Sequence, residues 1–413
     1  MSKVIFTLIG CMMLVSILAD PAPVSIQFED VILLSLPLLL ALFTVPLTVN
    51  YQVSIMERQM LLAVMFYLSY LLVSFFIGLL QGVSLLSCLR AVGPYINFFP
   101  LLILGFIPRH RFNPWTLALI LIAVGSLQAI YQMLLYLKHA HDISNTMDVL
   151  RGRITLIDPR TTLPLILCTA ILPFGLLSMT ARGEKKNIIF KLICVSLMIL
   201  SLFGAIATLT RAIILSLFFG WTIVIMLFVY GQVRHHQIII SHKSQLIWFG
   251  AIIVVLLFVL SELPTIKLLE QSVVTRFHHA AEFSASGDYS NGRLYDEWMP
   301  ALDTWMHSGI VGLFFGIGAG NSFNVITGEE RTYIHNLLIY SLVYGGLIGF
   351  FACIMLYFTA FKILLYRAWQ TKKMIYLSFA ALLGTLFFYS QLFAVHKGLA
   401  YNALLFLIIA VAL

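Results

Sequence analysis

Two arginines and one histidine have the types and surroundings of reactive residues. Arg211 follows two threonines in the run TLTRA, Arg293 lies in the run GRLY, and His335 lies in the run IHN. A guanidinium can bind two oxygens of a phosphate at once, and a neutral imidazole can take a proton from a hydroxyl. These side chains suit a phosphate-bearing anionic substrate with a proton transfer beside it.

Each of the three also has a plainer structural explanation. Arg211 could anchor a helix end at the membrane surface, although this arginine would lie on the side that is usually poor in basic residues. Arg293 could pair with a neighbouring acid such as Asp296 or Glu297. His335 could instead cap the helix that follows it or hydrogen-bond to its start. The motifs alone leave these alternatives open.

A second group of basic residues could bind an anionic substrate. Arg153 and Arg160 lie in one polar stretch and Arg276 in another. Attraction to anionic lipids, or pairing with nearby acids, explains them equally well. The pair His396-Lys397 is a weaker candidate of the same kind. We keep Arg153, Arg160 and Arg276 as candidate substrate-binding residues.

Several motifs that would indicate other chemistry are missing. The sequence has no Walker A motif, no HExxH, no DxD and no nucleophile elbow, so nothing supports ATP-driven transport or metalloprotease activity. Its five cysteines lie within apolar runs, without CxxC or metal-ligand spacing. We therefore expect no metal site and no cofactor.

The elements that position these residues are set by an apolar composition. Of the 413 residues, 61% are hydrophobic and only 10% are charged, whereas soluble domains carry about 25% charged residues. Continuous apolar runs predict an all-α polytopic membrane protein rather than a β-barrel. We expect about twelve transmembrane helices, at residues 3–19, 31–49, 60–80, 86–107, 114–137, 161–180, 188–207, 212–230, 246–262, 335–361, 374–394 and 398–413.

The first of these runs has a second possible interpretation. Its residues before Cys11 resemble a lipoprotein signal, but the run is short before Cys11 and continues to Ala19. We therefore expect an uncleaved first helix.

The distribution of charge predicts the orientation. The connections on the side of the N-terminus hold most of the basic residues and only two acids, Glu57 and Glu184. By the positive-inside rule both termini are cytoplasmic. The two long connections, 138–160 and 263–334, then lie outside, and the second carries short helices against the membrane. We expect residues 1–413 to form a single transmembrane domain with these loops as its working surface.

In their order along the chain, the three motifs resemble those of the O-antigen ligase and O-antigen polymerase superfamily. The resemblance includes the long loop before the tenth helix and the run YGGLIG within that helix. It covers roughly residues 150–355 by motif, and the whole chain by helix count and topology. It implies a GT-C-like glycosyltransferase of the bacterial inner membrane, with its active site on the periplasmic side.

The resemblance also implies a reaction. Such enzymes take a glycan from undecaprenyl diphosphate, without metal or nucleotide, in the biosynthesis of lipopolysaccharide or other surface polysaccharides. Ligases move the glycan to lipid A-core, and polymerases move it to another lipid-linked repeat unit. Arg211 and Arg293 match the arginines that hold the diphosphate, and His335 matches the catalytic histidine. Asn336, beside it in the same motif, becomes a candidate substrate-binding residue, and the expected transfer inverts the anomeric carbon.

Ligase and polymerase are nearly equal alternatives, with the ligase slightly favoured by the motifs around Arg211 and His335. Many other GT-C enzymes carry acidic residues in the first outer loop, and Glu29 and Asp30 occupy that place here. If these acids were catalytic, the donor would be a lipid monophosphate sugar. A lipid-linked oligosaccharide flippase or another transporter is the main alternative. It would require charges within the helices and an inverted repeat, and the sequence shows almost no charge within the helices and no repeat.

Overall fold

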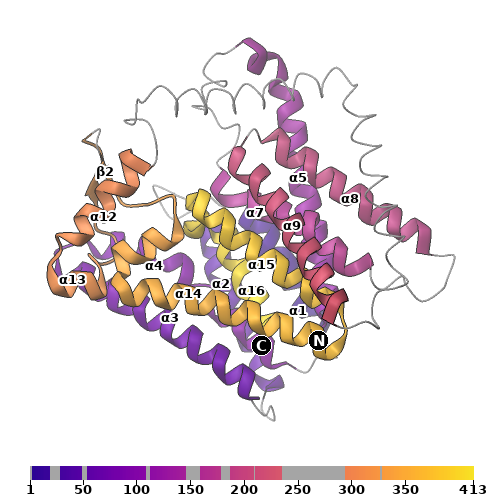
Figure 1. Cartoon of the computed structure of the whole chain (residues 1–413), viewed down its shortest axis with the longest axis horizontal. Coiled ribbons are helices and arrows are strands. Elements are labelled where there is room, and N and C mark those ends of the chain that lie inside the picture. The colour runs from indigo at the N-terminus through magenta and orange to yellow at the C-terminus, as the bar shows by residue number, and fades with distance from the viewer. Residues whose placement is uncertain are drawn as a thin grey trace. The chain divides into compact units, whose positions relative to one another are not determined.

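The structure is a computed structural model, and it describes residues 2–18, 28–48, 54–107, 112–145, 159–177, 187–208, 210–234, 294–325 and 328–413. These ranges are helical, apart from short connections and one two-stranded sheet (Figure 1). The α-helices are α1 (Ser2–Leu18), α2 (Phe28–Thr44), α3 (Ile55–Leu80), α4 (Leu85–Ile96), α5 (Pro114–Asn145), α7 (Pro159–Leu177), α8 (Asn187–Ala207), α9 (Arg211–Arg234), α12 (Met299–Met306), α13 (Gly309–Phe315), α14 (Leu337–Thr371), α15 (Met374–Leu392) and α16 (Leu399–Ala412).

The remaining elements are short. The 3-10 turns are η1 (Val45–Leu47), η2 (Phe99–Phe106) and η7 (Ala394–Lys397), and η6 (Leu294–Trp298) is a π-helical turn. Strands β1 (Phe323–Asn324) and β2 (Glu330–Arg331) pair antiparallel, with Phe323 opposite Arg331.

Five helical segments of the described chain are long and apolar enough to cross a membrane. A helix needs about 20 apolar residues to cross a hydrocarbon core of about 30 Å. The segments are Ile55–Leu80, Leu85–Phe106, Pro114–Lys138, Leu337–Thr371 and Met374–Leu392. Their number supports the expectation of a helical membrane protein. The twelve spans and the GT-C-like arrangement stay predictions.

The other expected segments coincide with shorter apolar helices, except 246–262, which lies outside the described residues. Most boundaries differ from the prediction by a few residues, and two differ more. Helix α5 continues to Asn145, so the first part of the predicted loop 138–160 is helical. Helix α14 continues to Thr371, past the expected end at 361. Hydropathy marks the stretch that suits a bilayer, whereas a helix can continue beyond it where no breaking residue stops it.

The helices pack into two compact units, and the expectation of a single transmembrane domain stays a prediction. The first contains Met1–Phe112, Glu282–Ile363 and Phe387–Leu413, and the second contains Asn113–Ala281 and Leu364–Leu386. In the first unit α16 is buried along its whole length and packs on η2. A Cβ on Gly105 would lie only 2.3 Å from the Cβ of Leu413, so this contact requires glycine.

Close backbone approach also joins the helices of the second unit. A Cβ on Gly125 of α5 would lie 2.2 Å from the carbonyl oxygen of Leu165 in α7. Beside it, Thr169 Oγ1 donates to the carbonyl oxygen of Ile122 at 3.1 Å. Small residues and hydroxyl groups at helix crossings are typical of helices that associate within a membrane.

Short elements precede α14 in the first unit, and we call them the loop module (residues 294–325 and 328–331). The expectation of short helices in the second long loop is confirmed by η6, α12 and α13. Gly318 has φ +83°, and a Cβ there would lie 2.4 Å from the amide nitrogen of Gly78 in α3. Gly346, where α14 kinks, has φ +63°, and a Cβ there would lie 2.2 Å from the carbonyl carbon of Phe314. These glycines let the loop module pack against α3 and α14.

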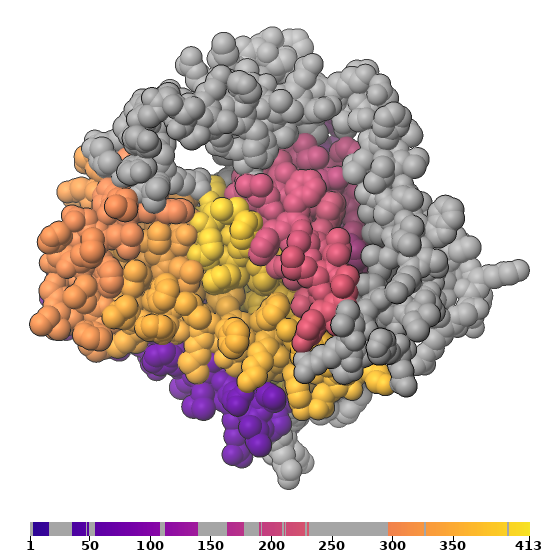
Figure 2. Space-filling view, in the orientation of Figure 1, coloured from indigo at the N-terminus to yellow at the C-terminus, as the bar shows by residue number. Residues whose placement is uncertain are grey.

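The loop module also forms part of the molecular surface. It accounts for the orange area at the left of Figure 2. Ile310 and Val311 of α13 are among its exposed apolar side chains. The expectation that these helices lie against a membrane stays a prediction.

Candidate active site around His335

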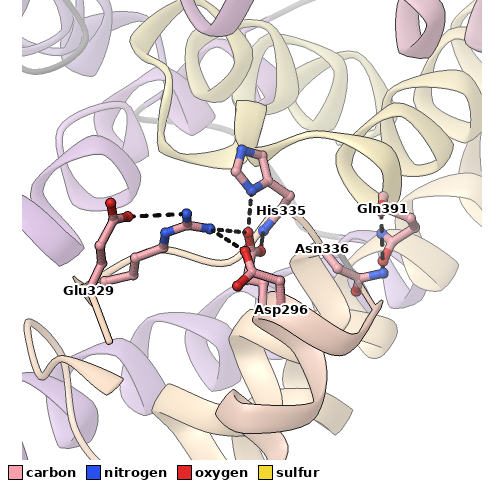
Figure 3. A network of polar contacts seen from close by, with 7 residues as sticks. Asp296, Glu329, His335, Asn336 and Gln391 are labelled. Atoms are coloured by element: carbon pink, nitrogen blue, oxygen red, sulfur yellow. Dashed lines mark hydrogen bonds and ion pairs between the residues drawn. The ribbon is translucent and has the colours of Figure 1, made fainter. Parts of the chain in front are cut away.

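His335 lies where the loop module meets the first turn of α14. Asn336 caps this helix, because its Oδ1 accepts the backbone N–H of Ile339 at 2.9 Å. Its Nδ2 donates to the carbonyl oxygen of Gln391 in α15 at 3.3 Å, and Gln391 Oε1 accepts the backbone N–H of Leu338 (Figure 3). Asn336, which we had expected to bind substrate, therefore has a structural role at the helix start. The capping role that was the alternative for His335 falls to its neighbour.

The imidazole of His335 is held by a buried carboxylate. Glu297 Oε2 lies 2.6 Å from His335 Nδ1, and Glu297 Oε1 accepts the backbone N–H of the same histidine. The Glu297 side chain is only 1% exposed and that of His335 is 16% exposed. In Figure 3 the second ring nitrogen, Nε2, lies on the side of the ring away from the carboxylates.

A guanidinium lies next to this carboxylate. Arg331 Nη1 is 3.5 Å from Glu297 Oε2 and 3.6 Å from Asp296 Oδ2, and Arg331 Nη2 is 3.4 Å from Glu329 Oε2. These distances are those of ion pairs rather than of short hydrogen bonds. The π-helical turn η6 supplies both Asp296 and Glu297, and β2 supplies the arginine. Its three carboxylate neighbours make Arg331 a counter-ion here rather than a phosphate ligand.

Aromatic rings surround the histidine on its other sides. Tyr333 and Phe393 meet the His335 ring edge-on, with centroids at 5.2 and 5.4 Å. Lys397 Nζ donates to the carbonyl oxygen of Thr332 at 2.6 Å and lies 5.8 Å from the centre of the Tyr333 ring. The site thus combines a half-buried base with acidic, basic and aromatic groups at the head of a helix that can span a membrane.

A second histidine lies nearby in a different environment. His396 is fully buried and lies against the Tyr340 ring, with centroids at 4.8 Å. Neither of its ring nitrogens has a hydrogen-bond partner among the described residues. Burial, followed by the positive charge of Lys397 and by repulsion from His335 whenever that ring is protonated, holds the pKa of His396 well below 6.5. We expect this imidazole to be neutral.

The structure describes little of the arginines that the sequence singled out. Arg211 is the first residue of α9, after a turn in which Thr208 Oγ1 accepts the backbone N–H of Thr210 at 3.1 Å. Arg160 lies in the first turn of α7, and the side chains of both arginines are outside the described part. Arg153, Arg276 and Arg293 lie outside the described residues altogether. Their roles stay predictions.

The role of the acidic pair at the start of the second helix also stays a prediction. Glu29 and Asp30 lie in the first turn of α2, and their side chains are not described. In the part of the chain that the structure describes, no group of three or more His, Cys, Asp and Glu side chains could hold a metal ion.

Two important residues were missed by the motif search. Glu297 was considered only as a possible partner of Arg293, and Arg331 was not considered at all. One usable signal was the position of Arg331, four residues before His335 in the run ERTYIH. Glu297, in the run DEWM, left no such signal, because nothing in that run marks it as the partner of a histidine 38 residues later.

Comparison of the chain with known proteins gives no match to any family model or to any curated protein. The motifs around Arg211, Arg293 and His335 therefore carry the functional argument together with the geometry.

Proposed function

We propose that this protein is an inner-membrane glycosyltransferase. It moves a glycan from an undecaprenyl-diphosphate-linked donor to an acceptor hydroxyl, as an O-antigen ligase or an O-antigen polymerase. The observation that carries the proposal is the His335 imidazole, held by a carboxylate at the head of the helix Leu337–Thr371. A base at this place could meet a hydroxyl group beside a lipid-anchored donor.

The proposed reaction is a direct displacement. The acceptor oxygen attacks the anomeric carbon of the donor sugar while the bond from that carbon to the diphosphate oxygen breaks, so the anomeric configuration inverts. The proton of the acceptor hydroxyl passes to His335 Nε2. General base catalysis of this kind contributes about 10²- to 10⁴-fold to a rate.

The leaving diphosphate needs positive charge. Arg331 faces three carboxylates, so the proposal assigns this role to Arg211 and Arg293, as the motif resemblance implies. Bidentate guanidinium contacts stabilise the charge that builds on the departing oxygens. Arg153, Arg160 and Arg276 are proposed as further contacts to the donor or the acceptor. The proposed site opens to the periplasm, and both termini are cytoplasmic.

Reconstitution of the purified protein tests the proposal. Vesicles receive an undecaprenyl-diphosphate-linked glycan, with or without lipid A-core and with EDTA throughout, and products are read by gel and mass spectrometry. Glycan on lipid A-core would identify a ligase, and longer glycans on the lipid carrier would identify a polymerase. Vesicles that leave a matched donor unchanged would contradict the transferase and direct attention to transport of the lipid-linked glycan.

Variants connect the activity to these residues. We expect His335→Ala, Arg211→Ala and Arg293→Ala each to lower transfer at least about 10²-fold without unfolding the protein. His307→Ala is the matched control, because His307 is an exposed histidine at the end of α12. Lysine carries the charge but not the bidentate fork, so near-normal transfer by a folded Arg211→Lys, Arg293→Lys double variant would argue against the phosphate role.

A further inference from the structure

We propose that Glu297 and Arg331 are positioning residues that orient the His335 imidazole and strengthen it as a base. This inference rests on the proposed function, because it assigns the roles of two residues that the motifs do not include. Its structural basis is the arrangement of one carboxylate, one guanidinium and one imidazole from three different segments of the chain.

Glu297 controls both the orientation and the tautomer of the ring. One of its oxygens contacts the backbone N–H of His335 and the other contacts ring atom Nδ1 at 2.6 Å. Because main chain and ring of the same residue are tied to one carboxylate, the ring has little freedom to rotate. An ionised carboxylate only accepts hydrogen bonds, so Nδ1 carries the proton and Nε2 carries the lone pair of the neutral ring.

The same contact strengthens the base. When Nε2 takes a proton, the ring becomes positively charged, and the carboxylate beside it stabilises that charge. The effect is larger in a buried site than in water, because the effective dielectric is lower. Glu297 is 1% exposed, so little water screens the pair.

Arg331 offsets the negative charge of the buried Glu297. Burying a carboxylate without a neighbouring positive charge is costly, and Asp296 beside it would add repulsion. Arg331 Nη1 lies within 3.6 Å of a carboxylate oxygen of each of these two acids. A guanidinium can serve several carboxylates at once through its planar set of donors, and an ammonium group is poorer at this.

The test measures how transfer depends on pH in reconstituted full-length protein. Glu297→Gln removes the charge in a side chain of the same shape. We expect kcat to fall about 10²-fold, with KM within a few-fold of wild type. The acidic limb of the kcat profile should move to lower pH by about one unit, because a less basic imidazole loses its proton at lower pH.

Two further variants make this test specific. Asp303→Asn makes the same chemical change on α12 of the loop module. The Asp303 carboxylate is exposed, and among the contacts described it pairs only with the exposed His307. We therefore expect this variant to keep the wild-type pH profile. Arg331→Lys should lower kcat less than Glu297→Gln does. An unchanged kcat and an unchanged acidic limb in folded Glu297→Gln would overturn the inference. If that variant does not fold, Glu297→Asp takes its place, because the shorter acid retracts the carboxylate, and a wild-type kcat would then overturn it.

A measurement without substrate separates this inference from the proposed function. In protein labelled with ¹⁵N at histidine, with the His335 signals assigned by comparison with His335→Ala, the nitrogen shifts report which ring atom carries the proton. We expect the proton on Nδ1 in the neutral ring, and a weaker preference in Glu297→Gln. A proton on Nε2 of the wild-type ring would overturn the inference even in an active enzyme. A protein that transfers nothing but shows the Nδ1 proton would refute the function alone.

Discussion

His335 and His396 show how strongly the surroundings decide what a histidine can do. The first has a carboxylate at Nδ1 and lies at the border of the loop module. The second is fully buried against Tyr340, without a hydrogen-bond partner in the described part of the chain. Both environments are formed by side chains that are distant in the sequence, so the local motifs IHN and HK could not distinguish the two histidines.

The low pKa of His396 makes the stability of the protein depend on pH. The unfolded chain takes up a proton at this residue near pH 6.5, whereas the folded chain does so only well below it. The unfolded state therefore binds more protons between these two values, and stability falls as the pH decreases below about 6.5, by at most about 1.4 kcal/mol per pH unit. We expect the thermal midpoint in detergent to decrease from pH 7 to pH 5.

The variant His396→Phe keeps a ring against Tyr340 and removes the titration. Its thermal midpoint should change less with pH than that of the wild type. His307→Ala, which removes an exposed histidine, should follow the wild-type curve. If the wild-type and His396→Phe curves were parallel, another group would be responsible for the pH dependence.

At the scale of single elements, the sequence predicted the helices well and their ends less well. Each expected apolar segment within the described ranges coincides with a helix. The ends of α5 and α14 differ because neither continuation contains a glycine or a proline, and in α14 it also includes the good helix formers Lys362, Arg367 and Gln370. The short elements η6, β1 and β2 leave almost no pattern, because a few residues cannot show a period.

The glycine of the loop module that approaches α3 most closely should be the least replaceable. Gly318→Ala places a methyl group 2.4 Å from the Gly78 amide nitrogen and also requires φ +83°. Gly328→Ala requires nearly the same φ, +82°, but its methyl group would meet nothing within 4 Å. Both variants carry the strain of a left-handed residue, about 1–2 kcal/mol, and only Gly318→Ala adds a clash.

Thermal unfolding of the two variants compares these contributions. We expect the midpoint of Gly318→Ala to be several degrees below that of Gly328→Ala. Equal midpoints would show that the loop module does not depend on close contact with α3.

At the scale of the whole molecule, the sequence predicted a membrane protein but not its division. Hydropathy and charge describe each helix separately, whereas the two compact units depend on which helices pack together. The same limit applies to the site. His335 was found from its motif, but Glu297 lies 38 residues earlier and Arg331 belongs to a strand of two residues. Only packing brings Glu297 to the segment that holds the other two.

Helix α14 gives a direct test of the orientation of the chain. It kinks at Gly346, and the 25 residues from Leu347 to Thr371, at about 1.5 Å each, span about 38 Å, which exceeds the bilayer core of about 30 Å. Its two ends should therefore lie on opposite sides of the membrane. A cysteine at His307, in the loop module, and one at Lys373, beyond the far end of α14, report on the two sides.

These cysteines are introduced one at a time into a protein with Cys11→Ser, because Cys11 is the exposed natural cysteine among the described residues. A membrane-impermeant maleimide should label His307→Cys in intact spheroplasts and Lys373→Cys only after permeabilisation. Labelling of both in intact cells would contradict the orientation, and the reverse pattern would invert it.

If the protein has the proposed function, the double contact of Glu297 also bears on how it could be captured with its proposed donor. One carboxylate oxygen accepts a main-chain N–H, and that group remains whatever side chain residue 335 carries. A His335→Ala protein would thus keep the link between η6 and the head of α14 while losing the proton acceptor. Such a protein would load the lipid-linked donor and hold it unreacted, which makes it the natural choice for trapping the complex for cryo-electron microscopy.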